Sequence, residues 1–263
     1  MALEKTHGII LKSIKYSDTD RILTCYTEKY GKIQCIAKRS RRKKNPFGPS
    51  IDLLTYAEIV LVKRGIKNIY PLREAIILRS YHRLYADLPR LYAAFYMAEL
   101  IRELTSLEDK RPEILLLFLR QLEMLQKGED VEKLIHIFEI RLLALLGYCP
   151  QMEKCLICLS HPESSRVGFI PSMGGIICPD CFRKKKLPFF IISRGSLNFL
   201  RQAVRFHLAK TTRLFLSPYS KKELQKVLYS FIIYYLEKDI QSYRFLLASL
   251  KDHNFRISAS GGN

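Results

Sequence analysis

Four cysteines near the middle of the chain have the spacing of a metal site. They form two C-x2-C pairs with 19 residues between them, made of Cys155, Cys158, Cys178 and Cys181. Each pair can place two sulfurs on one tight turn, and four thiolates supply the tetrahedral ligand set that Zn²⁺ accepts at about 2.3 Å. Two disulfides, or four thiols without a metal, are the alternatives. Because four protein ligands close the coordination shell, the pattern predicts one structural Zn²⁺ and no zinc-activated water.

The residues between the cysteine pairs predict a β-hairpin. Apolar residues 167–170 and 176–177 flank the turn Met173-Gly174-Gly175, whose glycines permit positive φ. This is the arrangement of a zinc-ribbon-like insert. His161 follows Cys158 by three residues and could replace a sulfur, but it stands beside Pro162 and has no paired histidine. We expect His161 to be a loop residue.

Length and composition favour a cytoplasmic protein of several modules. A chain of 263 residues is longer than a typical domain, which predicts two or three modules. No uncharged apolar run reaches the roughly 18 residues that span a bilayer, and the first residues lack a signal-peptide core. Seven cysteines fit a reducing compartment, with Cys25, Cys35 and Cys149 as free thiols. Their apolar surroundings predict that these three are buried.

Positive charge is concentrated at the two ends of the chain. The formal net charge is +19. Residues 1–80 carry 17 basic and 7 acidic residues, residues 81–150 carry 9 and 11, and residues 151–263 carry 18 and 7. A polyanion is the expected partner, because neutralising phosphates releases counterions and gives binding without sequence readout. An anionic membrane surface is the weaker alternative, since the densest basic run does not lie on an amphipathic helix.

The first 80 residues predict a small β-barrel. Five strand patterns follow one another, beginning at Ile9 and then covering residues 21–27, 32–38, 56–63 and 69–78. Five short strands in this length suggest a closed barrel, of which the OB-fold is the member that binds nucleic acid.

A basic loop follows the third strand. Six of the seven residues 38–44 are cationic, and only Ser40 interrupts them. A solvated surface is the plain alternative, but so many like charges favour a counter-anion such as phosphate. The predicted DNA-binding residues are Lys12, Arg21, Lys38, Arg39, Arg41, Arg42, Lys43 and Lys44. Aromatic residues near the loop could stack on bases, namely Tyr16, Tyr26, Tyr30, Phe47 and Tyr56.

Beyond residue 83 the apolar pattern becomes helical. Asp87, Pro112, Asp130 and Ser193 mark helix starts, and Ser220 with Glu223 forms a capping-box signature for a helix over residues 221–238. The predicted fold is therefore α+β and multidomain. Its modules are the OB-fold barrel at 1–80, the helical domain at 81–150 and 191–252, the zinc module at 151–190 and a disordered tail at 253–263.

No catalytic constellation is recognisable. The chain has no Walker loop, Rossmann glycine fingerprint, nucleophile elbow or H-E-x-x-H motif, and carboxylates are scarce in the basic regions. We expect a binding protein and not an enzyme.

The order of these motifs resembles the bacterial RecO family of recombination mediator and DNA repair proteins. The likeness covers nearly the whole chain and rests on residues 8–13, 20–24, 30–33 and 37–38 before the basic loop, on residues 143–150, on the paired C-x2-C motifs and on residues 174–178. It implies an OB domain, a helical domain and a zinc module, and a protein associated with the nucleoid.

The resemblance also implies an activity. The protein would bind single- and double-stranded DNA, anneal complementary strands and, with RecR, help to load RecA onto DNA coated by single-stranded-DNA-binding protein. We expect that protein's acidic C-terminal tail to bind the helical domain beside apolar residues such as 231–236. An RNA-binding protein of translation or transcription is the alternative, because charge and stacking do not separate RNA from DNA.

Overall fold

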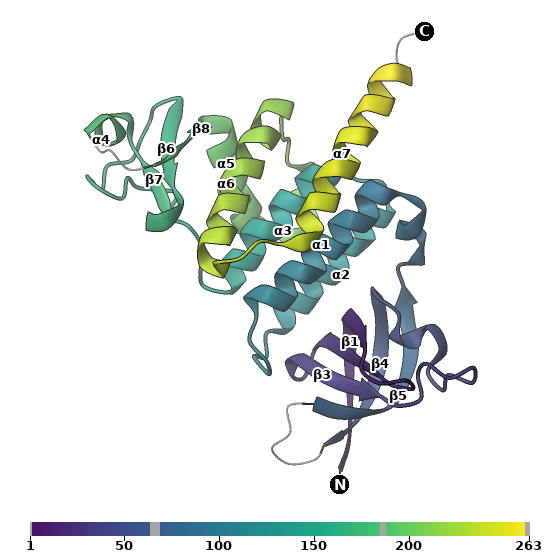
Figure 1. Cartoon of the computed structure of the whole chain (residues 1–263). Coiled ribbons are helices and arrows are strands. Elements are labelled where there is room, and N and C mark those ends of the chain that lie inside the picture. Colours follow the sequence, from purple (N-terminus) through teal and green to yellow (C-terminus); the bar gives the residue numbers. More distant parts are fainter. Residues whose placement is uncertain (1, 64–68, 185–187, 261–263) are drawn as a thin grey trace. The chain divides into compact units, whose positions relative to one another are not determined.

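The computed structural model describes residues 2–63, 69–184 and 188–260 (Figure 1). Its contacts divide the chain into two compact units. The first unit comprises Met1–Lys127 and Ser242–Asn263, and the second comprises Gly128–Gln241. No helix in the described residues is both long enough and apolar enough to span a bilayer.

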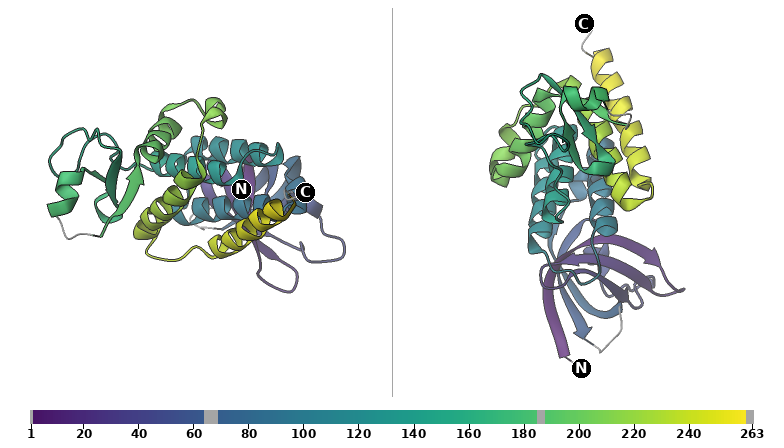
Figure 2. Two further views of the ribbon diagram at one scale, coloured as in Figure 1. Left: turned by 90° about the horizontal axis from the view of Figure 1, so that it is seen from above. Right: turned by 90° about the vertical axis from the view of Figure 1, so that its left-hand side faces the viewer.

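The N-terminal part of the first unit is a closed β-barrel, drawn in purple to blue (Figures 1 and 2). Its strands follow the order β1-β2-β3-β5-β4, and β4 returns to pair with β1. Neighbouring strands are antiparallel except β3 and β5, which run parallel. The described residues pair Gln34 with Ile69, Cys35 with Tyr70 and Ile36 with Pro71. The strands are β1 (Ala2–Lys15), β2 (Arg21–Thr27), β3 (Gly31–Ala37), β4 (Thr55–Lys63) and β5 (Ile69–Ser80).

Apolar residues that alternate along the strands fill the barrel. Cys25 and Cys35 belong to this core with exposed fractions of 1% and 0%, so their predicted burial is confirmed. Cys149 is exposed, and its predicted burial is wrong. It follows the positive-φ residue Gly147, in the segment that leaves a helix end, so its apolar neighbours in sequence do not enclose it.

Three α-helices complete the first unit, namely α1 (Leu88–Leu104), α2 (Pro112–Gln126) and α7 (Gln241–Ser260), and a short 3-10 helix, η2 (His82–Ala86), precedes them. Asp87 caps α1 as predicted, because its side chain accepts a hydrogen bond from the amide of Arg90. Helix α7 includes residues 253–260, which the sequence assigned to a disordered tail, and residues 261–263 lie outside the described residues.

The loop between α1 and α2 is attached to strand β3, which explains why these helices group with the barrel. Lys32 Nζ donates hydrogen bonds to the carbonyl oxygens of Arg102 and Thr105, at the end of α1. The amide of Glu108 donates to the carbonyl of Lys32 at 2.8 Å. Gly31 has φ +64°, and a Cβ there would lie 2.0 Å from the carbonyl oxygen of Asp109. The close approach therefore requires glycine at this turn.

The second unit joins a helical group to a small three-stranded sheet. Helix α3 (Val131–Leu145) packs against α5 (Arg194–Arg205) and α6 (Pro218–Leu236). The sheet has the order β7-β6-β8 and is built from β6 (Arg166–Ile170), β7 (Gly175–Ile177) and β8 (Phe190–Ser193), with the short helix α4 (Pro179–Lys184) between β7 and β8. Strands β6 and β7 are antiparallel and Gly174 has φ +68°, so the predicted hairpin is confirmed. Strand β8 was not predicted.

The predicted capping box at Ser220 and Glu223 is wrong. Helix α6 begins three residues earlier, where the side chain of Ser217 accepts from the amide of Ser220 and Pro218 occupies the first turn. Glu223 instead reaches the start of α5. Its Oε2 accepts from the amide of Ser193 at 3.0 Å and from the hydroxyls of Ser193 and Ser196. A carboxylate in this place also interacts favourably with the positive end of the α5 dipole.

Candidate nucleic-acid interface and metal centre

The basic loop leaves the barrel at the end of β3 and exposes most of its cations. Lys38, Arg39, Arg42, Lys43 and Lys44 are exposed, whereas Arg41 is half-buried. Ser40 is buried and donates its hydroxyl to the carbonyl of Ala37 at 2.7 Å. No carboxylate in the described residues lies within salt-bridge distance of the loop's cations. The Asp20 carboxylate interacts electrostatically with Lys38 and Arg42, but the loop carries six cations, so most of its charge is available to an external anion.

A neighbouring turn holds this loop in place. Asp20, between β1 and β2, accepts hydrogen bonds from the amide of Arg39 at 2.9 Å and from the hydroxyl of Thr19 at 2.8 Å. The amide of Arg41 donates to the carbonyl of Thr19 at 3.0 Å, and its guanidinium donates to the carbonyl of Ser17 at 2.5 Å. The hydrogen bond from the Arg39 amide, followed by that from Thr19, lowers the pKa of Asp20. The turn and the loop thus form one surface.

The other two predicted cations lie on the strands that lead to this surface. Arg21 opens β2, opposite Lys15 of β1 and Ala37 of β3, so it lies next to the origin of the loop. Lys12 is exposed on β1 opposite Thr24, farther along the strand. The structure therefore brings Arg21 and the loop together at one end of the barrel, with Lys12 some residues away.

Of the aromatic residues suggested for base stacking, Tyr16 is the most exposed. It is 61% exposed on the same turn as Asp20, and its amide donates to the Asp20 carbonyl at 3.1 Å. Tyr26 and Phe47 are buried, and Tyr26 donates its hydroxyl to the carbonyl of Arg111. Tyr30 and Tyr56 are half-buried. Tyr26 and Phe47 are therefore core residues.

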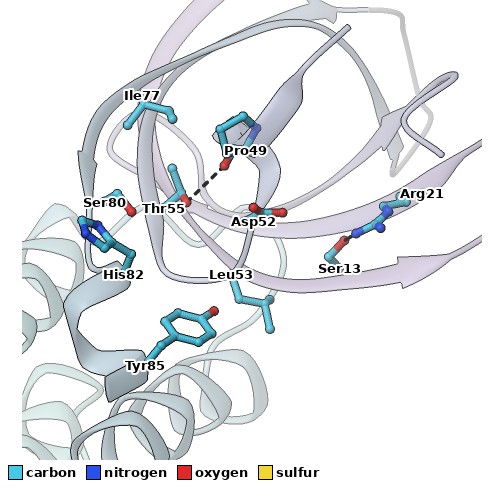
Figure 3. A pocket seen from close by; sticks show the side chains of 10 residues that line it. All are labelled: Ser13, Arg21, Pro49, Asp52, Leu53, Thr55, Ile77, Ser80, His82 and Tyr85. Atoms are coloured by element: carbon cyan, nitrogen blue, oxygen red, sulfur yellow. Dashed lines mark hydrogen bonds between the residues drawn. The ribbon is translucent and has the colours of Figure 1, made fainter. Parts of the chain in front are cut away.

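Sequence reasoning missed a cavity beside the barrel end (Figure 3). It has a volume of about 660 Å³ and lies within the first unit, between β1, β2, the β3–β4 connection, the end of β5 and helix η2. Arg21 and Ser13 line one end of it, and Tyr85 and His82 line the other. These residues are scattered between positions 13 and 85, and no local motif links them.

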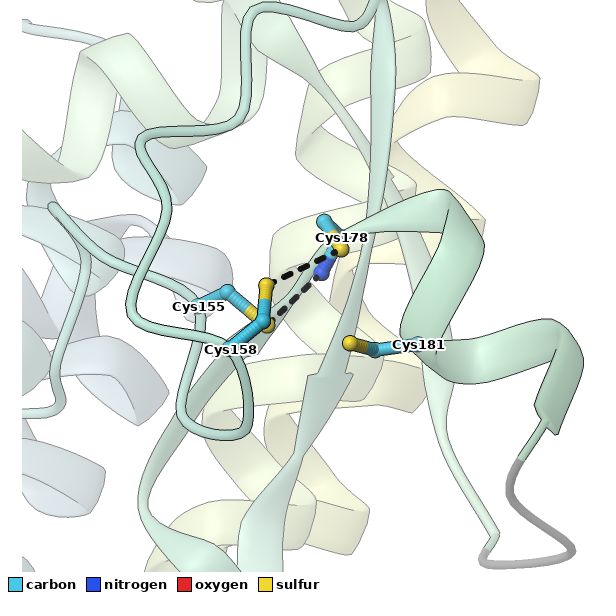
Figure 4. A group of neighbouring side chains, drawn as sticks. All are labelled: Cys155, Cys158, Cys178 and Cys181. Carbon is cyan, nitrogen blue, oxygen red and sulfur yellow. Dashed lines mark hydrogen bonds between the residues drawn. The ribbon is translucent and has the colours of Figure 1, made fainter.

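The four predicted ligands converge in the second unit (Figure 4). The sulfurs of Cys155, Cys158, Cys178 and Cys181 all lie within 4.8 Å of one another. The first pair is on the turn before β6, Cys178 follows β7 directly, and Cys181 lies on α4. Strand β7 and the first turn are joined because the amide of Leu156 donates to the carbonyl of Ile176 at 2.9 Å.

The sulfur spacing fits a tetrahedral zinc site. The Sγ atoms of Cys158 and Cys178 are 3.7 Å apart. Two ligands at about 2.3 Å from a tetrahedral Zn²⁺ are about 3.8 Å apart, whereas a disulfide requires about 2.05 Å. The amide of Cys178 donates to the sulfur of Cys155 at 3.3 Å. Hydrogen bonds from the hydroxyl and the amide of Ser160 lower the pKa of Cys158 to about 6, which favours the thiolate that binds a metal.

His161 takes no part in this cluster. It is exposed in the loop after the first cysteine pair, as predicted. Beneath the cysteines, Ile170 and Ile177 are fully buried, and the rings of Phe182 and Phe189 pack with centroids 5.0 Å apart. This apolar base is small, so bonds to a metal would contribute much of the local stability.

The apolar segment 231–236 of α6 is divided between core and surface. Phe231 and Ile232 are buried, whereas Tyr234 and Tyr235 are 50% and 40% exposed. The ring of Tyr148 packs against Tyr235 at an angle of 36°, with ring centroids 4.7 Å apart. The segment therefore offers aromatic rings at its surface and not a continuous apolar stripe, and its binding of an acidic tail stays a prediction.

Comparison with known proteins identifies the family. The family model described as "Recombination protein O N terminal" matches residues 1–81, and "Recombination protein O C terminal" matches residues 85–244. The chain is 30% identical over 241 residues to the DNA repair protein RecO of Caldicellulosiruptor saccharolyticus, with 92% of this chain and 96% of the relative covered. It is 33% identical over 211 residues to the DNA repair protein RecO of Rubrobacter xylanophilus, with 80% and 84% covered. The chain therefore belongs to the RecO family.

Proposed function

We propose that this protein is a non-enzymatic recombination mediator of DNA repair that binds single- and double-stranded DNA and anneals complementary strands. With RecR, it promotes loading of RecA onto DNA coated by single-stranded-DNA-binding protein. Family membership supports this proposal, and its relatives carry the name DNA repair protein RecO. The observation that carries DNA binding is the basic loop, whose exposed cations form no salt bridge in the described residues and whose backbone Asp20 holds in place.

The barrel supports the same proposal. Its strand order β1-β2-β3-β5-β4, with β3 and β5 parallel, is the arrangement we assign to an OB-fold. OB-folds bind nucleic acid through a charged groove and stacking side chains. Lys12, Arg21, Lys38, Arg39, Arg41, Arg42, Lys43 and Lys44 would contact phosphates, and Tyr16 would stack on a base. Contacts of this kind carry little sequence preference.

The four cysteines would hold one structural Zn²⁺. Bound there, the ion would join the turn before β6 to α4 and so stabilise the hairpin between them. The residues themselves provide the thiolates, the Cys178 amide that donates to Cys155, and the Ser160 hydroxyl 3.1 Å from the sulfur of Cys158.

Strand annealing tests the proposal. One oligonucleotide carries a fluorophore and its complement carries a quencher, so annealing lowers the fluorescence. The two strands are mixed alone, with this protein, and with this protein plus purified RecR and single-stranded-DNA-binding protein. We expect faster annealing with the protein, including on coated strands. An unchanged rate in every mixture would contradict the proposal.

An RNA-binding role in translation or transcription is the competing function. The phosphate contacts of the loop do not distinguish RNA from DNA, so binding to labelled single-stranded DNA, duplex DNA and structured RNA must be compared at one salt concentration. Binding to structured RNA that exceeds binding to both DNAs would favour the competing function.

A further inference from the structure

The cavity at the barrel end combines a cationic end with an aromatic end. Arg21 lies at one end and Tyr85 at the other, with Leu53 and Ile77 contributing apolar surface (Figure 3). Its volume of about 660 Å³ falls within the roughly 300–1,000 Å³ of ordinary small-ligand sites. It adjoins the basic loop, because Arg21 follows Asp20 directly and Asp20 binds the amide of Arg39.

Arg21 has unused hydrogen-bonding capacity. Its Nη1 donates to the hydroxyl of Ser13 at 3.4 Å, which is a long contact, and its Nε is buried without a hydrogen-bond partner. A buried donor without an acceptor is unfavourable. A guanidinium binds phosphate or carboxylate through two N–H groups of its fork, and a DNA strand offers phosphate. The cationic end of the cavity thus suits a phosphate.

Tyr85 provides a surface for a base. Its side chain is 49% exposed, and its ring packs at 83° against Phe95 with centroids 6.3 Å apart, which restrains it. Ile77, which also lines the cavity, is 40% exposed and adds apolar surface that a base could contact. Burial and then the charge of Asp52 raise the pKa of Tyr85 above its ordinary value of about 10. Asp52 also lines the cavity, between its two ends (Figure 3), and would repel a phosphate placed beside it.

We propose that this cavity holds one unpaired nucleotide of a single-stranded DNA, with its phosphate on Arg21 and its base against Tyr85. This inference rests on the proposed DNA binding and adds to it a preference for single-stranded over duplex DNA. A base in a duplex is stacked on both faces and paired at its edge, so it cannot enter without leaving the helix. The basic loop binds phosphates of either form, whereas the cavity favours the single strand.

The test compares single-stranded and duplex DNA binding of the full chain at fixed salt, by fluorescence anisotropy. Tyr85→Ala should weaken single-strand binding by roughly 5- to 150-fold, the range for one stacked base, and leave duplex binding unchanged. Tyr85→Phe keeps the ring and should restore most of the affinity. Tyr219→Ala, which removes a 56% exposed tyrosine in the second unit, is the matched control and should change neither affinity.

A second variant, Ile77→Glu, puts a carboxylate into the cavity and should also weaken single-strand binding selectively. Circular dichroism and thermal melting of each variant verify folding. Free dAMP is a further arm, because a lone nucleotide offers the same phosphate and base. Binding of dAMP that depends on Tyr85, with single-strand affinity unchanged by Tyr85→Ala, would assign the cavity to a free nucleotide and overturn the proposal.

The remaining outcomes separate this inference from the proposed function. Equal losses on both DNAs in Tyr85→Ala would place Tyr85 on a general DNA surface and overturn the cavity assignment. Unchanged affinities in both Tyr85→Ala and Ile77→Glu would overturn it too, while the proposed function stands. A wild-type protein that binds neither DNA would overturn the proposed function itself.

Discussion

The carboxylate of Asp20 accepts a 2.9 Å hydrogen bond from the backbone amide of Arg39, across 19 residues of sequence. The bond fixes the first residues of the basic loop against the turn between β1 and β2. Because the Asp20 carboxylate is charged, this hydrogen bond is stronger than one to a neutral acceptor. The same bond restrains Arg39, which has a φ of +59°, a conformation that residues other than glycine seldom adopt.

This bond predicts a pH dependence of the loop. It lowers the pKa of Asp20 in the folded protein, so folding favours the ionised carboxylate. Its contribution is complete above the unfolded pKa of about 3.9 and is lost as the pH falls through the lower folded value. The Arg39 amide resonance, followed by NMR, should therefore titrate with a midpoint below about 3.9. Asp20→Asn should abolish that titration. A midpoint at or above the ordinary value would contradict the assigned role.

The exposed cations of the loop should set the salt dependence of DNA binding. Arg42, Lys43 and Lys44 are exposed, whereas Arg41 is also bonded to Ser17, so the first three form the cleaner test. Changing them together to alanine should lower the slope of log affinity against log salt by up to about 2.1 on single strands and 2.7 on duplex, if each contacts one phosphate.

Three lysines of the second unit serve as the control for that triple variant. Lys210, Lys222 and Lys226 are exposed, and their change to alanine removes the same charge. An unchanged slope in the loop variant, together with a reduced slope in the control, would move the DNA site to the second unit.

Replacing Cys178 with serine should release the metal. The purified protein under reducing conditions should contain close to one zinc per chain, and Cys178→Ser close to none, with a lower melting temperature because metal binding and local folding are one equilibrium. Cys149→Ser is the matched control, since Cys149 is an exposed cysteine outside the cluster. Wild-type protein without near-stoichiometric zinc would refute the structural-zinc interpretation.

Glu223→Ala should destabilise the second unit. It removes the acceptor for the Ser193 amide and for two hydroxyls at the start of α5. A hydrogen bond to a charged group contributes about 1.5–3 kcal/mol, and we expect a loss of this order in the free energy of unfolding by urea. Glu237→Gln, an exposed carboxylate just beyond the same helix α6, should cost much less. Equal losses in the two variants would show that the bonds at α5 contribute little.

Local patterns predicted most of the fold but not the contacts between distant segments. Strand β3 and the starts of α1, α2 and α3 follow from alternation, Pro112 and the capping aspartates. The four cysteines could be predicted because C-x2-C turns fix the ligand geometry locally. The partner of Asp20 could not, since a single aspartate in a turn does not indicate which distant amide it will reach. Ser220 and Glu223 matched a local capping pattern, yet Pro218 began the helix earlier and freed Glu223 for α5.

Strands β3 and β5 meet at a parallel seam of the barrel, and Cys35 lies on that seam, so it can report barrel opening. In the described residues, three pairs join β3 to β5 and seven join β2 to β3, so we expect local opening to begin between β3 and β5. Cys35 belongs to one of the β3–β5 pairs and is fully buried. Its hydrogen bond with Cys25, together with burial, raises the pKa of its thiol. In the closed barrel this thiol is therefore unreactive. The rate at which the Cys35 thiol is alkylated measures how often β3 separates from β5. DNA that binds both strands would slow that rate.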